Sequence, residues 1–133
     1  MVALVFFASV AFAQTPTTAQ EFLTRGNRYS NNGDYDRAIA DYTQAIRLAH
    51  NAAEPYFNRG VAYGNKNDFD KAIADCTQAI KLNSIDAEPY NNRGVAYANK
   101  GNYVKAIADF EAALRIDPNH ADAKNNLEIL KSR

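Results

Sequence analysis

The chain has 133 residues, of which 47% are hydrophobic and 23% charged, and its 15 basic side chains balance its 15 acidic ones. This composition is typical of one soluble domain and excludes a disordered or collagen-like chain. Because binding to nucleic acids or anionic membranes needs a surplus of basic side chains, the zero net charge argues against both partners. One cysteine and two histidines are too few for an internal disulfide or a Cys/His zinc cluster.

The N-terminal residues 1–13 carry no charged side chain and are almost wholly apolar. They are too few to span a bilayer, which takes about 20 residues, but they match the apolar region of a secretory signal peptide. Residues 11–13 (Ala-Phe-Ala) fit the small-x-small rule for cleavage before Gln14. We therefore expect a signal peptide, a linker at residues 14–18, and export to the periplasm or exterior without membrane insertion after cleavage. The segment lacks Lys and Arg, so an N-terminal helix of a cytoplasmic protein is the alternative.

Beyond the linker the sequence repeats with a period of 34 residues. One glycine, one tyrosine and two alanines of each unit recur at this spacing. The recurring residues are Gly26, Gly60 and Gly94; Tyr29, Tyr63 and Tyr97; Ala38, Ala72 and Ala106; and Ala45, Ala79 and Ala113. Repeats of this length predict a stacked array of units, which we place at residues 19–52, 53–86 and 87–120.

Each unit contains two stretches in which apolar residues have helical spacing. In the second unit, Tyr56, Gly60 and Tyr63 form the first stretch, and the pattern resumes at intervals of three and four over residues 69–80. A short polar segment separates the two stretches and ends on a side chain that can cap the next helix. These capping residues are Asp34, Asp68 and Asn102. The sequence therefore predicts an all-α fold of tandem helical hairpins.

The recurring glycines lie in the middle of the first helix of each unit, where glycine costs about 1 kcal/mol relative to alanine. A glycine repeated there indicates a close contact that a Cβ atom would obstruct. We expect the contact to be with the second helix of the same hairpin, on the side of the recurring alanines Ala38, Ala72 and Ala106.

These features resemble the tetratricopeptide repeat (TPR) family. The third unit follows the family pattern with Tyr90, Gly94, Tyr97, Ala106, Phe110, Ala113 and Pro118. The resemblance covers residues 19–120, and the tail at residues 121–133 resembles the polar helix that caps such arrays. It implies a right-handed superhelix of stacked hairpins whose first helices line a concave groove, where a peptide or protein segment binds.

The resemblance also places one set of side chains from each first helix in the groove. The residues expected to contact a peptide are Leu23, Asn27, Phe57, Val61, Asn65, Glu88, Asn91, Val95 and Asn99. The apolar members would form a strip along the groove, and the asparagines would form its rim.

The best-known TPR binding chemistry is a carboxylate clamp, which holds the C-terminal carboxylate of a peptide with Lys, Arg and Asn side chains. Asn27 and Asn58 match its amides, but Leu23, Glu88 and Asn92 occupy its cationic positions. Because a carboxylate that faces Glu88 would be repelled, we do not expect a clamp here.

Three other features have a functional and a structural interpretation. One arginine per repeat could bind an anionic partner, but each recurs with an aspartate of the second helix, and we expect the two to pair. The arginines are Arg25, Arg59 and Arg93, and the aspartates are Asp41, Asp75 and Asp109. Cys76 lies on the core side, where we expect an inert side chain rather than a redox site. We expect His50 and His120 to be surface or turn residues.

The sequence contains no glycine-rich phosphate loop, nucleophile elbow or metal-binding signature. We therefore expect neither an enzyme nor a bound cofactor or metal. The predicted function is a non-catalytic interaction module that binds a peptide or protein segment. The alternatives are a self-associating assembly protein and a chaperone-like protein for secreted substrates, and for the oligomeric state we favour a monomer.

Overall fold

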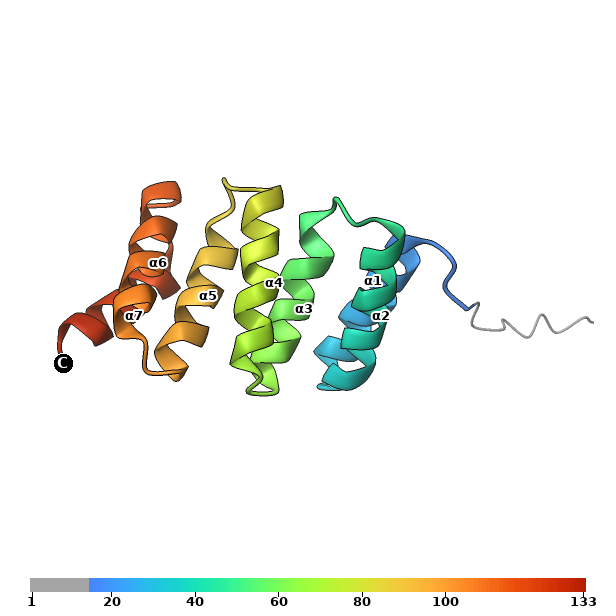
Figure 1. Ribbon diagram of the computed structural model, residues 1–133, viewed down its shortest axis with the longest axis horizontal. Helices are drawn as coiled ribbons and strands as arrows, with labels where there is room; N and C mark the ends of the chain where they lie inside the picture. The colour runs from blue at the N-terminus through green and yellow to red at the C-terminus, as the bar shows by residue number, and fades with distance from the viewer. Residues whose placement is uncertain (1–14) are drawn as a thin grey trace, which may run out of the picture.

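The computed structural model describes residues 15–133, and within this range the chain forms seven α-helices and no strand (Figure 1). The helices are α1 (Ala19–Asn31), α2 (Tyr35–Leu48), α3 (Ala53–Asn65), α4 (Phe69–Leu82), α5 (Ala87–Asn99), α6 (Tyr103–Ile116) and α7 (Ala121–Lys131). The first six form three hairpins, one within each predicted unit, which confirms the all-α fold of tandem hairpins. The signal peptide predicted for residues 1–13 lies outside the described range.

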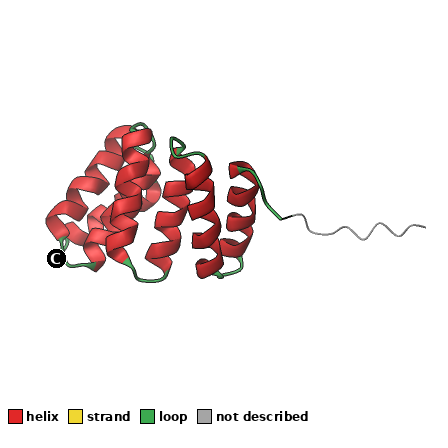
Figure 2. Cartoon of the chain, turned by 45° about the vertical axis from the view of Figure 1, so that its right-hand side comes forward, coloured by secondary structure: helices red, strands yellow, loops and turns green. Residues whose placement is uncertain are grey.

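The hairpins stack in chain order, so that the helices stand side by side in a row (Figure 2). The first helices α1, α3 and α5 also contact one another along the row, and α5 contacts α7, whereas the second helices do not contact each other. Because the first helices lie closer together than the second helices, the array is curved and its inner side is formed by α1, α3 and α5. None of the helices in residues 15–133 is long and apolar enough to cross a membrane.

Each hairpin turn combines a left-handed residue with a side-chain cap. The caps are Asp34, Asp68 and Asn102, which accept a hydrogen bond from the backbone N–H three residues further on, as predicted. The residue before each cap has a positive φ, namely +77° at Gly33, +62° at Asn67 and +79° at Gly101. Glycine adopts this region without steric cost, and asparagine is among the few other residues that tolerate it.

The mid-helix glycines contact the second helix of their own hairpin, as predicted, but the side chains nearest to them are not those of the recurring alanines. A Cβ atom would lie 2.7 Å from a ring carbon of Tyr42 in the first repeat and 2.7 Å from a ring carbon of Phe110 in the third. In the second repeat, where Cys76 replaces the aromatic ring, the same atom would lie 3.2 Å from Sγ. The side chain at this one position therefore determines how much space a Cβ atom would find at the glycine.

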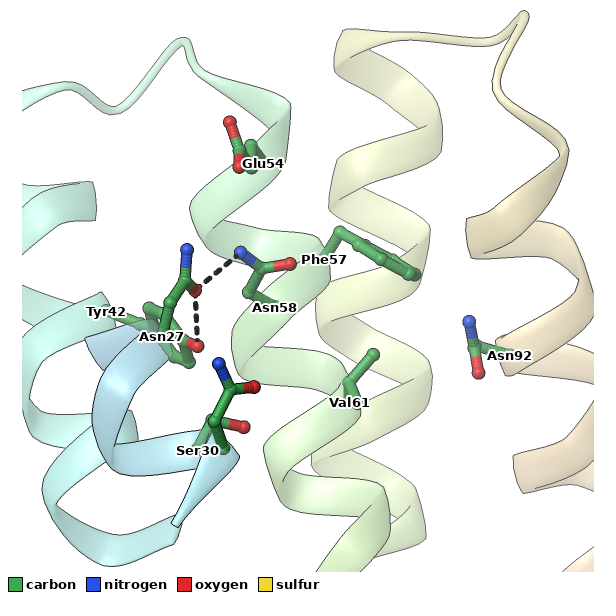
Figure 3. A pocket seen from close by; sticks show the side chains of 9 residues that line it. Asn27, Ser30, Tyr42, Glu54, Phe57, Asn58, Val61 and Asn92 are labelled. Carbon is green, nitrogen blue, oxygen red and sulfur yellow. Dashed lines mark hydrogen bonds between the residues drawn. The ribbon is translucent and has the colours of Figure 1, made fainter. Parts of the chain in front are cut away.

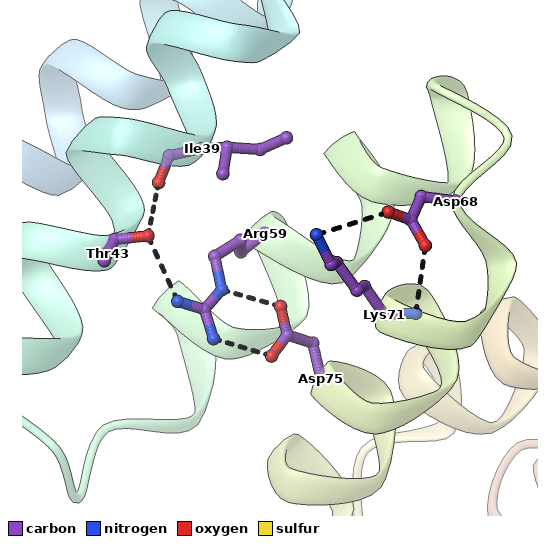
Figure 4. A network of polar contacts seen from close by, with 6 residues as sticks. All are labelled: Ile39, Thr43, Arg59, Asp68, Lys71 and Asp75. Atoms are coloured by element: carbon purple, nitrogen blue, oxygen red, sulfur yellow. Dashed lines mark hydrogen bonds and ion pairs between the residues drawn. The ribbon is translucent and has the colours of Figure 1, made fainter.

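The recurring arginines pair with the buried aspartates of the second helices, which confirms their structural assignment. Arg59 donates from Nε and Nη2 to the two carboxylate oxygens of Asp75, at 2.7 and 2.8 Å, and the Asp75 side chain is only 8% exposed (Figure 4). These hydrogen bonds are the main cause that raises the pKa of the Arg59 guanidinium. Its Nη1 donates to Thr43 Oγ1 of the preceding repeat, so the pair also joins neighbouring hairpins. The equivalent pairs are Arg25–Asp41 and Arg93–Asp109.

His120 lies in the turn between α6 and α7, as predicted, but it is not a surface residue, because it is buried and only 8% exposed. Its Nδ1 accepts a hydrogen bond from the Ala123 N–H and caps α7, so the proton of the neutral ring is on Nε2. Nε2 lies 3.0 Å from Glu88 Oε1 and donates to it, which ties the last helix to α5. His50, in contrast, is exposed in the turn after α2, as predicted.

Candidate functional site: the groove on the inner side

The inner side of the array is hollowed between α1, α3 and α5. The cavity measures about 550 Å³, which is within the range of ligand sites, and Tyr42 of α2 closes it from behind (Figure 3). Its lining residues are Asn27, Ser30, Asn31, Tyr42, Glu54, Phe57, Asn58, Val61 and Asn92. A second cavity of about 200 Å³ continues between α3 and α5. The two cavities make up a groove that extends across all three repeats.

A network of three side chains fixes the amides at one end of the groove. Asn27 Oδ1 accepts hydrogen bonds from the Tyr42 hydroxyl at 2.7 Å and from Asn58 Nδ2 at 3.1 Å (Figure 3). Because both contacts need an acceptor, they determine the orientation of the Asn27 amide, and the second contact determines that of Asn58. Asn27 Nδ2 and Asn58 Oδ1 therefore remain as one donor and one acceptor at the cavity.

Tyr42 holds this network from the core. Its ring is buried, and burial is the main cause that raises the pKa of its hydroxyl, with a further contribution from the negative charge of Glu54. The hydroxyl therefore keeps its proton and remains a donor to Asn27. Tyr42 was not among the predicted site residues, although the sequence holds a signal for it. Cys76 and Phe110 occupy the same position in the other repeats, and only Tyr42 carries a hydroxyl there.

An apolar surface lies beside the amides. Phe57 and Val61 are one turn apart on α3, the central first helix, and both are half-buried and reach the cavity (Figure 3). In the second cavity, Val61 is joined by Val95 of α5, with Asn65 and Asn99 at the edge. The groove thus places an apolar strip next to polar groups that have hydrogen-bonding capacity left.

Seven of the nine predicted site residues are accessible and two are not. The cavities bring together Asn27, Phe57, Val61, Asn65, Val95 and Asn99. The expectation that Leu23 and Asn91 face the groove was wrong, because they are only 5% and 6% exposed. Leu23 packs in a core cluster that includes Ala62 of the next repeat, and Asn91 accepts a hydrogen bond from Asn126 of α7 at 3.2 Å. Glu88 is exposed but lines neither cavity.

The titratable side chains of the described residues bear on metal binding and on the reactivity of Cys76. Within residues 15–133 no three His, Cys, Asp or Glu side chains gather as a possible metal site. Cys76 is buried, and burial raises the pKa of its thiol to about 12, which leaves it protonated and unreactive at neutral pH. This agrees with an inert cysteine.

Comparison with known families matches residues 53–85 and 87–120 to the tetratricopeptide repeat and residues 26–67 to a TPR repeat. The chain belongs to the tetratricopeptide repeat family. Its fold class is accordingly the TPR superhelix, whose members serve as interaction modules. The comparison with curated proteins gives no match.

Several solved TPR domains are similar over most of the chain. The first TPR domain of Spaghetti (RPAP3), bound to the HSP90 peptide SRMEEVD, is 30% identical, with a TM-score of 0.84, over 86% of this chain and 91% of that one. The second TPR domain of human RPAP3, in complex with the HSP70 peptide SGPTIEEVD, is 33% identical, with a TM-score of 0.83, over 86% and 96%. The TPR domain of Arabidopsis OM64 is 30% identical, with a TM-score of 0.85, over 86% and 95%.

Proposed function

We propose that this TPR array is a non-catalytic interaction module that binds an extended segment of a partner protein in the groove formed by α1, α3 and α5. The observation that carries the proposal is the oriented pair of amides, Asn27 and Asn58, beside the apolar side chains of Phe57 and Val61. The peptides bound by the similar domains of RPAP3 support peptide binding as the activity.

The amide pair matches the needs of a peptide backbone. A peptide group presents one N–H donor and one C=O acceptor, and an extended segment leaves these groups unpaired until it binds. The free Nδ2 of Asn27 can donate to a carbonyl, and the free Oδ1 of Asn58 can accept from an N–H. These contacts hold the backbone of any sequence, so the apolar strip has to supply the selectivity and much of the affinity.

The test is the affinity of the Phe57→Ala variant for a peptide selected against the intact protein. Phe57 is the aromatic residue at the centre of the groove, and its loss should weaken binding by about 2 kcal/mol while the far-UV helix signal stays unchanged. Tyr56→Ala is the matched control, because Tyr56 is also a half-buried aromatic residue of α3 but does not line the cavities. A peptide whose affinity is unaffected by Phe57→Ala and by Asn58→Ala would contradict the proposal.

Two further measurements test the alternatives, which are self-association and a chaperone-like role. Light scattering after size exclusion should give the mass of a monomer at micromolar concentration. A dimer that Phe57→Ala dissociates would instead assign the groove to a second copy of the chain. Suppression of aggregation of unfolded secreted proteins would favour the chaperone-like role.

We also propose that the protein is exported and that its mature form begins at Gln14. The apolar residues 1–13 and the cleavage pattern at their end support this localisation. N-terminal sequencing of the protein from its native host should give Gln14 or its cyclised form as the first residue. A cytoplasmic protein that retains residues 1–13 would refute export, and the function of the groove would be unaffected.

A further inference from the structure

The lining of the groove contains a single charged side chain. Glu54 is the one charged side chain that lines the first cavity, and no charged side chain lines the second. Within residues 15–133 no basic side chain pairs with Glu54, because the ion pairs of this range join other residues. Glu54 also lies in the first turn of α3, where the helix dipole favours a negative charge. The groove thus contains an acidic side chain without a basic partner.

The arginines of the first helices do not neutralise this charge. Arg25, Arg59 and Arg93 bind the aspartates of the second helices through two hydrogen bonds each, so their positive charges are already compensated. At an ionic strength of about 0.1 M, charges more than about 10 Å apart are largely screened. Of the side chains that line the two cavities, Glu54 alone is charged, so the lining carries a negative charge.

Glu88 extends the negative charge along the same side of the array. It holds the position in α5 that Glu54 holds in α3, and its side chain is exposed. One carboxylate oxygen accepts from His120 Nε2, which fixes its position and leaves the second oxygen available. The first turns of α3 and α5 thus each carry a carboxylate, of which that of Glu54 lines the groove and that of Glu88 lies outside both cavities.

We propose that the groove selects an internal segment of a partner protein in which a lysine or arginine stands two residues from an apolar residue. This inference rests on the function proposed above. Glu54 and Phe57 are three residues apart on α3, so their Cβ atoms are about 5–6 Å apart. In an extended segment, side chains at i and i+2 point to the same side and are about 7 Å apart. When an apolar side chain of the bound segment packs against Phe57 and Val61, a basic side chain of the segment at i+2 or i−2 therefore lies next to Glu54.

The first experiment is selection from a library of random peptides displayed inside a phage coat protein, so that neither peptide terminus is available. Bound sequences should be enriched in an apolar residue two positions from a lysine or arginine. In the best sequence, made as a peptide with acetylated and amidated ends, replacing the basic residue by glutamine should weaken binding about threefold to fivefold. Replacement by glutamate should weaken it further, and added salt should weaken the parent peptide most.

Glu54→Gln tests the carboxylate itself, and Glu128→Gln is the matched control. Glu128 is an exposed residue of α7 that does not line the first two cavities, so it undergoes the same chemical change outside the groove. Glu54→Gln should reduce the affinity for the basic peptide to that of its glutamine version, and Glu128→Gln should leave it unchanged.

The outcomes separate this inference from the proposed function. If peptides bind and Phe57→Ala abolishes binding, but the basic residue and Glu54 make no difference, the selectivity is refuted and the groove stands as the binding site. If the selected peptides are acidic, the selectivity is reversed and the inference is wrong. If peptides bind regardless of Phe57, Asn58 and Glu54, or if no peptide binds, both proposals fall.

Discussion

Replacing Gly94 and Gly60 by alanine separates the cost of the close helix contact from the gain in helix propensity. At both positions alanine gains about 1 kcal/mol over glycine in a helix interior. The Cβ atom at Gly94 would lie 2.7 and 2.9 Å from two ring carbons of the buried Phe110 and 3.2 Å from the Ala106 carbonyl oxygen. Overpacking of this kind costs about 1–3 kcal/mol, so Gly94→Ala should lower the free energy of unfolding by up to about 2 kcal/mol.

The second repeat provides the comparison within the same molecule. At Gly60 the nearest atoms are Asp75 Cβ and Cys76 Sγ, both at 3.2 Å, which need to move by only a few tenths of an ångström. The strain and the gain in propensity should nearly cancel, so Gly60→Ala should change the free energy of unfolding by less than about 0.5 kcal/mol. Urea denaturation followed by far-UV circular dichroism measures both variants.

A double-mutant cycle tests whether the aromatic ring is the cause. Phe110→Cys gives the third repeat the side chain of the second, and Gly94→Ala should cost less in that background. The coupling free energy between the two positions should be about 1–2 kcal/mol. Equal effects of alanine at Gly60 and Gly94, or a coupling of zero, would refute the view that this one side chain limits the space at the glycine.

Two further predictions concern buried groups of the second repeat. Arg59→Ala should lower the free energy of unfolding by about 3 kcal/mol, because it leaves the buried Asp75 carboxylate without its partner. Arg59→Lys should recover only part of this loss. The control is Lys105→Ala at an exposed position, and an Arg59→Ala loss no larger than that of the control would argue against a structural pair. Burial raises the pKa of the Cys76 thiol from 9.0 to about 12, so the unfolded chain loses the thiol proton at a lower pH than the folded chain does. The free energy of unfolding should therefore fall as the pH rises from about 9 to about 12. Cys76→Ala should show a smaller fall over that range in urea denaturation, and an identical pH dependence would show that the thiol is not protected.

The fold was predictable from the sequence because its determinants are local and occur three times. The 34-residue period, the helical spacing and the capping residues of the turns each involve residues close in the chain. The pairing of Arg59 with Asp75 was also predictable, because the two types recur together at a constant separation. Each repeat is an independent observation of the same contact, which is why the hairpin packing agreed with expectation.

The site was only partly predictable, because its residues do not recur with the repeat. Leu23, Phe57 and Asn91 occupy the same position in the three successive repeats, but each has a different environment. Leu23 is buried against Ala62 of the next repeat, Phe57 reaches the cavity, and Asn91 is covered by α7. Burial at this position depends on the neighbouring hairpin, which the spacing within one unit does not describe. The burial of His120 was missed for the same reason, since its partner Glu88 is 32 residues away and the pair occurs once.

A reversal of charge should convert the groove to the specificity of the carboxylate clamp. Asn27 and Asn58, which match the amides of the clamp, are already oriented by hydrogen bonds, whereas Glu88 and Asn92 stand at two of its cationic positions. The unmodified protein should not bind the peptide SRMEEVD measurably. The acidic side chains and the C-terminal carboxylate of the peptide would be repelled by Glu54 and Glu88 of the protein.

The variant Glu88→Lys with Asn92→Arg should bind that peptide at least about tenfold more tightly, since charge-assisted hydrogen bonds then replace repulsion. The affinity should decrease as salt is added. The control is Glu128→Lys with Asn125→Arg, which changes the net charge equally at exposed positions of α7. If the control gains as much affinity, the effect is one of net charge. If the unmodified protein already binds SRMEEVD as tightly as the variant, the repulsion attributed to the two glutamates is absent. The groove would then have to hold an acidic terminus through its amides alone.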